Sequence, residues 1–93
     1  MYDKEMFLPI EGYDNYLISS YGRVINKNTM KELSQYNKRD RKCVSLWYNG
    51  VKSNHYVHRL VAEAFIPKEK YHYSVIHIDG DKSNNYYKNL EWI

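Results

Sequence analysis

The sequence predicts an α+β fold: a small β-rich N-terminal half of antiparallel hairpins, one central amphipathic helix, and a terminal pair of short strands. Strand-like alternation between turn signals fills the first half. One later segment has a helical period, and the last has two short apolar runs joined by an Asx- and Gly-rich loop. We expect the 93 residues to form a single domain, 1–93, with a β-rich part at 1–56, a helix at 57–66 and a terminal hairpin at 74–93.

The β-rich part is predicted from its turns. Gly22 is suited to the positive φ of a tight turn, and Asn49-Gly50 is the sequence signal of a type I′ hairpin turn. The basic, apolar-free connection 37–42 between the two hairpins is expected to stand in solvent. The predicted strands pair as Tyr16–Ser19 with Arg23–Asn26, and as Lys42–Tyr48 with 51–56.

The helix is predicted from a change of period. Its apolar residues recur three and four positions apart, which places them on one face of an amphipathic helix. Pro67 ends the pattern, whereas His58, Arg59 and Glu63 lie off the apolar face. The apolar positions are Val57, Leu60, Val61, Ala64 and Phe65.

Charge is concentrated in the middle of the chain. The segment Arg23–Arg59 has nine basic and two acidic residues, a net charge of +7, whereas the whole chain has only +3. Such a segment attracts phosphate, although a solvated basic surface would have the same composition. We predict DNA binding by six residues that would have to share one face: Arg23, Lys38, Arg39, Arg41, Lys42 and Lys52.

The composition excludes several other classes of protein. Cys43 is the single cysteine, so the chain has neither an internal disulfide nor a thiolate metal cluster. No apolar run approaches the roughly 20 residues that span a bilayer, and the N-terminal residues lack the features of a secretory signal. We therefore expect no membrane partner and a cytoplasmic location.

Three blocks of sequence, in order, resemble one known family. The front, from Ile10-Glu11-Gly12-Tyr13 to Tyr21-Gly22-Arg23-Val24, resembles a nuclease-associated modular motif. The segment Val57–Ile66 resembles the helix that leads into a nuclease core. The end, with His77-Ile78-Asp79-Gly80 and Asn89-Leu90-Glu91-Trp92, resembles the first two strands of a ββα-metal module. Together the blocks resemble the HNH homing-endonucleases of phages and mobile introns.

This resemblance implies a phosphodiester-cleaving site around His77. In the family a histidine on the first strand is the general base on water, and one divalent ion stabilises the charge on the phosphate. By similarity the base falls at His77, and Asn89 is the asparagine that fixes the loop and orients the histidine.

The same resemblance predicts that catalysis is lost. The family holds its ion with an Asp, Asn or His just before the base, and with an Asn or His on a helix after the second strand. Ile76 occupies the first position and has no donor atom, and no counterpart of that last helix follows Trp92. We therefore expect a vestigial base, no metal and no other cofactor, unless a divalent site is rebuilt from other residues such as Asp79, Asp81 or His72.

The predicted lack of the last helix also bears on partners. That helix would cover the terminal hairpin, so Leu90 and Trp92 are predicted to form an uncovered apolar patch that binds a protein partner or a second copy.

Three functions remain open at this point. The first is a catalytically inactive, HNH-like phage protein that binds DNA through its basic central region. The second is an inhibitor, for example an anti-CRISPR protein, that binds a protein partner through the terminal hairpin. The third is a metal-dependent DNA nicking endonuclease with unusual ligands.

Overall fold

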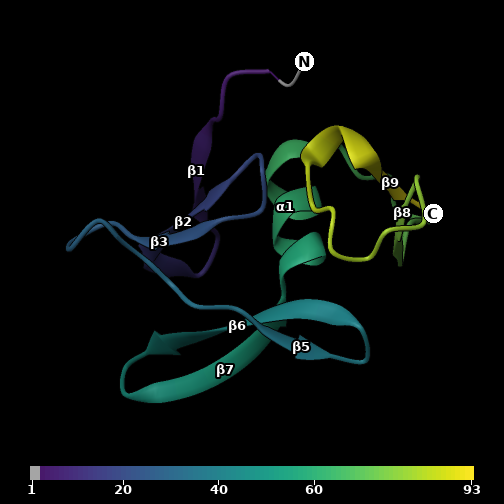
Figure 1. Ribbon diagram of the computed structural model, residues 1–93. Coiled ribbons are helices and arrows are strands. Elements are labelled where there is room, and N and C mark those ends of the chain that lie inside the picture. Colours follow the sequence, from purple (N-terminus) through teal and green to yellow (C-terminus); the bar gives the residue numbers. More distant parts are fainter. Residues whose placement is uncertain (1–2) are drawn as a thin grey trace.

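Antiparallel strands make up most of the molecule, and they form three small sheets around one helix (Figure 1). The structure is a computed structural model that describes residues 3–93, so the first two residues of the predicted β-rich part lie outside it. The first sheet has the strand order β1-β2-β3-β4. Its strands are β1 (Phe7–Ile10), β2 (Tyr13–Ser19), β3 (Val24–Asn26) and β4 (Lys31–Glu32).

The second sheet has the order β5-β6-β7 and turns tightly at both ends of its long central strand. Tyr48 pairs with Val51, so Asn49-Gly50 is the predicted two-residue turn, with both φ angles positive at 49° and 77°. The connection 37–42 stands largely in solvent as expected, and it also forms a second hairpin, which was not predicted, in which Lys38 pairs with Arg41. The strands are β5 (Tyr36–Lys38), β6 (Arg41–Tyr48) and β7 (Val51–Tyr56).

Helix α1 (Val57–Phe65) follows β7 directly and fills the space between the sheets (Figure 1). Its predicted apolar face is confirmed, since Val57, Leu60 and Val61 are buried in the core with strand residues such as Ile18, Val24, Val44 and Leu46. His58 lies off that face, as predicted, and is nevertheless buried.

The terminal segment forms the third sheet, β8 (Val75–His77) paired with β9 (Leu90–Trp92). A loop and a short 3-10 turn, η1 (Tyr87–Asn89), connect these two strands. The prediction that Leu90 and Trp92 form an uncovered patch is wrong, because each is only 4% exposed. Leu90 joins the core, while the Trp92 indole N–H donates to the Ile66 carbonyl at 3.1 Å. The hairpin packs on α1, and this contact covers both side chains.

The front sheet and the terminal hairpin are joined directly. The Tyr87 amide donates to the Ser20 carbonyl at 2.8 Å, and Lys88 forms an ion pair with Asp3 at 2.8 Å. Gly22 contributes by having no side chain, since a Cβ there would lie 2.8 Å from the Cβ of Asn85. The predicted α+β class is therefore confirmed in its coarse form, as mostly antiparallel strands and one α-helix among the described residues.

Candidate functional site

His77 ends strand β8 with its ring toward helix α1. The two faces of a strand alternate, so His77 shares a face with Val75, and Ile76 lies on the other. The ring of His77 packs against the ring of His58, with 5.2 Å between centroids. Its Nε2 is 2.8 Å from the Asn85 Oδ1, so the imidazole orientation is fixed by a buried amide.

The residue that bonds to His77 differs from the predicted one. Asn89 is predicted to orient the histidine, but the bond comes from Asn85, which is packed against Gly22 of the front sheet. Sequence reasoning missed this role because Asn85 lies eight residues from His77 in an Asx-rich loop where every amide is a plausible brace. The packing against Gly22 becomes visible only once the fold brings the two segments together.

Asn89 instead fixes the loop, which is the other part of its expected role. Its Nδ2 donates to the Asp79 Oδ1 and to the Asn84 carbonyl, both at 2.9 Å, and its Oδ1 accepts from the Asp79 amide at 3.1 Å. The Asp79 carboxylate also accepts from the Asn84 side chain and from the Asp81 amide. These bonds, that from Asn84 foremost, lower the pKa of Asp79.

The family implies a divalent ion here, and the residues present do not fit one. Ile76 is 39% exposed and offers no donor, while the Asp79 carboxylate is committed to the loop. Asp81 accepts from the amide and hydroxyl of Ser83, and the His72 Nδ1 accepts from the Glu69 amide. Across residues 3–93, no three His, Cys, Asp or Glu side chains are grouped so as to hold a metal.

The six predicted DNA-binding residues do not share one surface, and this part of the prediction is wrong. Arg23 is neutralised by Glu5 at 2.7 Å and Glu32 at 3.1 Å, and these two acids raise its pKa. Lys42 pairs with Asn37 and therefore points to the opposite face of the hairpin from its neighbour Arg41.

Lys52 pairs with Trp47 near the far end of β6, roughly 20 Å from Arg41 at about 3.3 Å per residue. The two turns lie at opposite ends of the sheet (Figure 1). Lys38, Arg39 and Arg41 do come together, at the tip of the β5–β6 hairpin.

This tip borders a cavity of about 280 Å³. We call it the basic cavity, and its lining includes Arg39, Arg41, Arg59, His58, Tyr56 and Ser74. Burial chiefly, and then the charges of His77, Arg41 and Arg59, lower the pKa of His58 to about 4. No sequence signal indicated a role for His58, since a single histidine off the apolar face of a helix is usually exposed.

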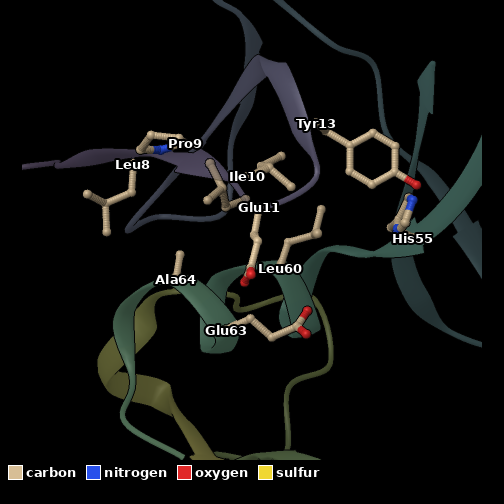
Figure 2. A pocket seen from close by; sticks show the side chains of 10 residues that line it. Leu8, Pro9, Ile10, Glu11, Tyr13, His55, Leu60, Glu63 and Ala64 are labelled. Carbon is tan, nitrogen blue, oxygen red and sulfur yellow. The ribbon is translucent and has the colours of Figure 1, made fainter. Parts of the chain in front are cut away.

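A larger cavity, of about 500 Å³, opens on the other side of α1 (Figure 2). Its walls are mostly apolar, but Glu11 points into it from the β1–β2 turn and Glu63 from α1, with His55 and Tyr13 at one end. We call it the acidic cavity. Two carboxylates repel phosphate, so this larger space is the poorer candidate for a nucleic-acid site.

Models of two protein families match the chain, one after the other. Residues 5–47 match the NUMOD4 motif, and residues 55–93 match a family described as HNH endonuclease. Two uncharacterized HNH endonucleases of Acanthamoeba polyphaga mimivirus are each 40% identical to the chain, over 89 and 91 residues. These alignments take in 92% and 97% of the chain but 22% and 28% of the relatives.

A solved structure matches the fold as well as the sequence. It concerns DNA binding and cleavage by the HNH homing endonuclease I-HmuI, and it superimposes with a TM-score of 0.86 at 33% identity. The match covers 95% of the chain and 52% of that protein. A modular front motif followed by a histidine-bearing ββ hairpin is thus the architecture of an HNH-type nuclease. The chain belongs to the HNH homing-endonuclease family.

The chain spans about a quarter of the length of the two viral relatives, and about half of that of I-HmuI. None of the helices that the structure describes is long and apolar enough to cross a membrane.

Proposed function

We propose that this chain binds double-stranded DNA through the tip of the β5–β6 hairpin. One observation carries the proposal: Lys38, Arg39 and Arg41 gather at this tip, where Arg39 and Arg41 line a cavity with Val75 of the strand that bears His77, and no carboxylate among residues 3–93 forms an ion pair with them. Unpaired cations on a projecting hairpin are available to phosphate, whereas Arg23 is not. The similarity to I-HmuI, a homing endonuclease that binds and cleaves DNA, supports DNA as the partner.

Salt dependence tests this proposal. Fluorescence anisotropy with a labelled duplex should show affinity falling roughly a hundredfold between about 50 and 200 mM salt, if about four phosphates are contacted. Changing Lys38, Arg39 and Arg41 together to Gln should weaken binding to unrelated sequences alike, and Lys52→Gln should have little effect. Binding that is insensitive to salt, or absent at low salt, would contradict the proposal.

We also propose that these residues do not cleave the DNA that they bind. His77 is oriented by Asn85 and retains the geometry of a base, but the position before it is an isoleucine. A base without a cation leaves the charge that develops on the phosphate unstabilised, which removes several kcal/mol of transition-state stabilisation. Supercoiled plasmid with Mg²⁺ or Mn²⁺ should stay intact. Nicking that disappears in His77→Ala would favour the metal-dependent nickase.

An inhibitor that acts through an exposed terminal hairpin is not proposed further. That hypothesis depended on Leu90 and Trp92 being free to meet a partner, and both are buried within the chain.

A further inference from the structure

The basic cavity is lined by positive charge that comes from α1 as well as from the hairpin tip. Arg39 comes from the β5–β6 turn, Arg41 from β6 and Arg59 from the first turn of α1. No Asp or Glu is among the residues that line the cavity. Three cations from three segments that face a shared space, with no acid among them, are the arrangement expected of an anion site.

Two of these arginines contact other parts of the chain through their guanidinium groups. The Arg59 Nη1 donates to the Tyr73 carbonyl at 2.9 Å, and its guanidinium lies over the Trp92 ring at 5.4 Å. The Arg41 Nη1 reaches the Arg39 carbonyl at 3.5 Å. None of the ion pairs within the described part of the chain involves either of them. Arg59 is thus held in place and Arg41 only weakly restrained, and neither charge is compensated by an acid.

The start of α1 adds to the same field. Its first N–H groups have no intrahelical partner, and helix dipoles place partial positive charge there. Tyr56 caps the helix without a side-chain hydrogen bond, and the first turn has no acidic residue. No acidic side chain in the first turn therefore compensates the partial positive charge at this end of the helix.

His58 is the independent observation that points to a ligand. It lines the cavity, it is only 6% exposed, and its Nδ1 has no hydrogen-bond partner. A buried polar atom without a partner is costly and calls for an explanation. The charged and titratable groups that face it are Arg41 from β6, Arg59 from its own helix, His77 from β8 and Tyr56 from β7. An anion would offset the repulsion that these cations exert on a protonated imidazole.

We propose that the basic cavity binds one phosphodiester of the DNA backbone, held by Arg39, Arg41 and Arg59, with His58 as the buried group that takes up a proton when the phosphate enters. This inference rests on the proposed DNA binding and adds a defined subsite to it. Ser74 and Val75 border the cavity and His77 contacts His58, so the bound phosphate lies beside the strand that carries the family's base.

Binding by variants tests the cavity as distinct from general charge. Arg41→Gln and Arg39→Gln should each weaken duplex binding about tenfold and reduce the slope of affinity against salt by about one. Lys52→Gln removes the same charge from the far end of the sheet, and Glu63→Gln alters the acidic cavity. Both should leave affinity within about twofold of the wild-type chain.

Nuclear magnetic resonance of the imidazoles supplies a readout that misfolding does not mimic. In the full chain, His58 should protonate at higher pH when a short duplex is present, and also with inorganic phosphate alone. His55, in the acidic cavity, should not respond to either. If the Arg39 and Arg41 variants bind like wild type and His58 ignores both probes while DNA still binds, the cavity assignment is overturned and DNA binding stands.

The other outcomes separate the two proposals. If no duplex binds but inorganic phosphate shifts His58, the cavity is a site for free phosphate, and its assignment to DNA is overturned together with the proposed function. If His58 responds to the duplex but not to inorganic phosphate, and Arg41→Gln abolishes that response, the phosphodiester assignment is supported. If neither probe binds, both proposals fail.

Discussion

The two cavities beside α1 each contain a histidine, and their charges differ in sign. His58 lies among Arg39, Arg41 and Arg59, whereas His55 lies near Glu11 and Glu63. Burial lowers the pKa of both, but the surrounding cations lower that of His58 further, while Glu63 opposes the lowering at His55. Volume therefore does not decide which of the two cavities suits an anion. The smaller cavity has the positive charges and the unpartnered atom, and the larger one is mostly apolar with two carboxylates pointing into it.

The two histidines also differ in their hydrogen bonds. The His55 Nε2 is 2.8 Å from the Ser53 hydroxyl, which is itself 2.9 Å from the Tyr13 hydroxyl, so its polar atom belongs to a closed network. The Nδ1 of His58 has no partner. The His55 Nε2 therefore has a partner within the fold, whereas the His58 ring packs against Tyr56 and His77 and leaves its buried Nδ1 without one.

Of the variants proposed here, Trp92→Ala should have the largest effect on stability, because the buried Trp92 ring supports Arg59 in the basic cavity. The ring is 4% exposed, and both Arg59 and Lys68 lie over it, at 5.4 and 5.1 Å. Truncation should cost about 3–4 kcal/mol of unfolding free energy, measured by urea denaturation. Trp47, which is 53% exposed, offers a matched control, and Trp47→Ala should cost well under half as much. Equal losses would show that Trp92 does not anchor this wall.

Acidification should expose the difference between the histidines. His58 has a pKa of about 4 in the folded chain against an ordinary value of 6.5, so the unfolded chain binds the proton more tightly. Stability is then complete above about pH 7 and falls as the pH drops through 6.5 toward 4, by about 2 kcal/mol at pH 5. Urea titrations at about pH 7.5 and pH 5 measure the loss.

The control for this prediction is a substitution at each histidine. His58→Gln should remove most of the pH-dependent loss, whatever it does to stability near neutral pH. His55→Gln should leave most of it in place. A loss of stability on acidification that persists in His58→Gln would have to come from other groups. Carboxylates with a lowered pKa, such as Asp79 and Asp81, lose their charge only at lower pH.

Local sequence signals predicted the helix and most of the strands, though not β1, because each of these depends on neighbouring residues. Asn49-Gly50 specifies its own turn, and the apolar period of 57–65 specifies its own buried face. The β5–β6 hairpin was missed for the opposite reason. Arg39 and Asp40 have φ angles of 53° and 64°, which non-glycine residues rarely adopt, and a run of basic residues gives no strand signal. Such a turn persists only where its surroundings stabilise it.

The site was less predictable than the fold because its parts are distant in sequence. His77 could be identified from its strand and loop, but the amide that holds it depends on Gly22, which belongs to the opposite end of the chain. The neutralisation of Arg23 depends on Glu5, and the burial of Trp92 depends on how the hairpin packs on α1. Charge counting finds basic residues, and only the fold shows which of them are unpaired.

Tyr13→Phe should remove one hydrogen bond from the network around His55 in the acidic cavity. The hydroxyl bonds to Ser53, and the ring packs edge-on against His55 with 5.0 Å between centroids. Removing one partly buried hydrogen bond should cost about 1 kcal/mol of unfolding free energy. Tyr71 is 70% exposed, so Tyr71→Phe should have no measurable effect. DNA affinity should be unchanged by either substitution, and a loss in Tyr13→Phe alone would extend the DNA site toward the acidic cavity.

Glu63→Gln should produce the smallest effect, and it isolates the charge that distinguishes the two histidines. Glu63 opposes the lowering of the His55 pKa, so removing its charge should lower that pKa further, in the direction of His58. Glu63 is exposed and its field is screened by solvent, so stability should scarcely change. Glu11 lines the same cavity but is not among the charges that act on His55, which makes Glu11→Gln the matched control. Imidazole titration by nuclear magnetic resonance measures both variants. No shift in Glu63→Gln would mean that burial alone sets the His55 pKa and that the two cavities differ only in their arginines, and the same downward shift in both variants would mean that Glu11 also acts on His55.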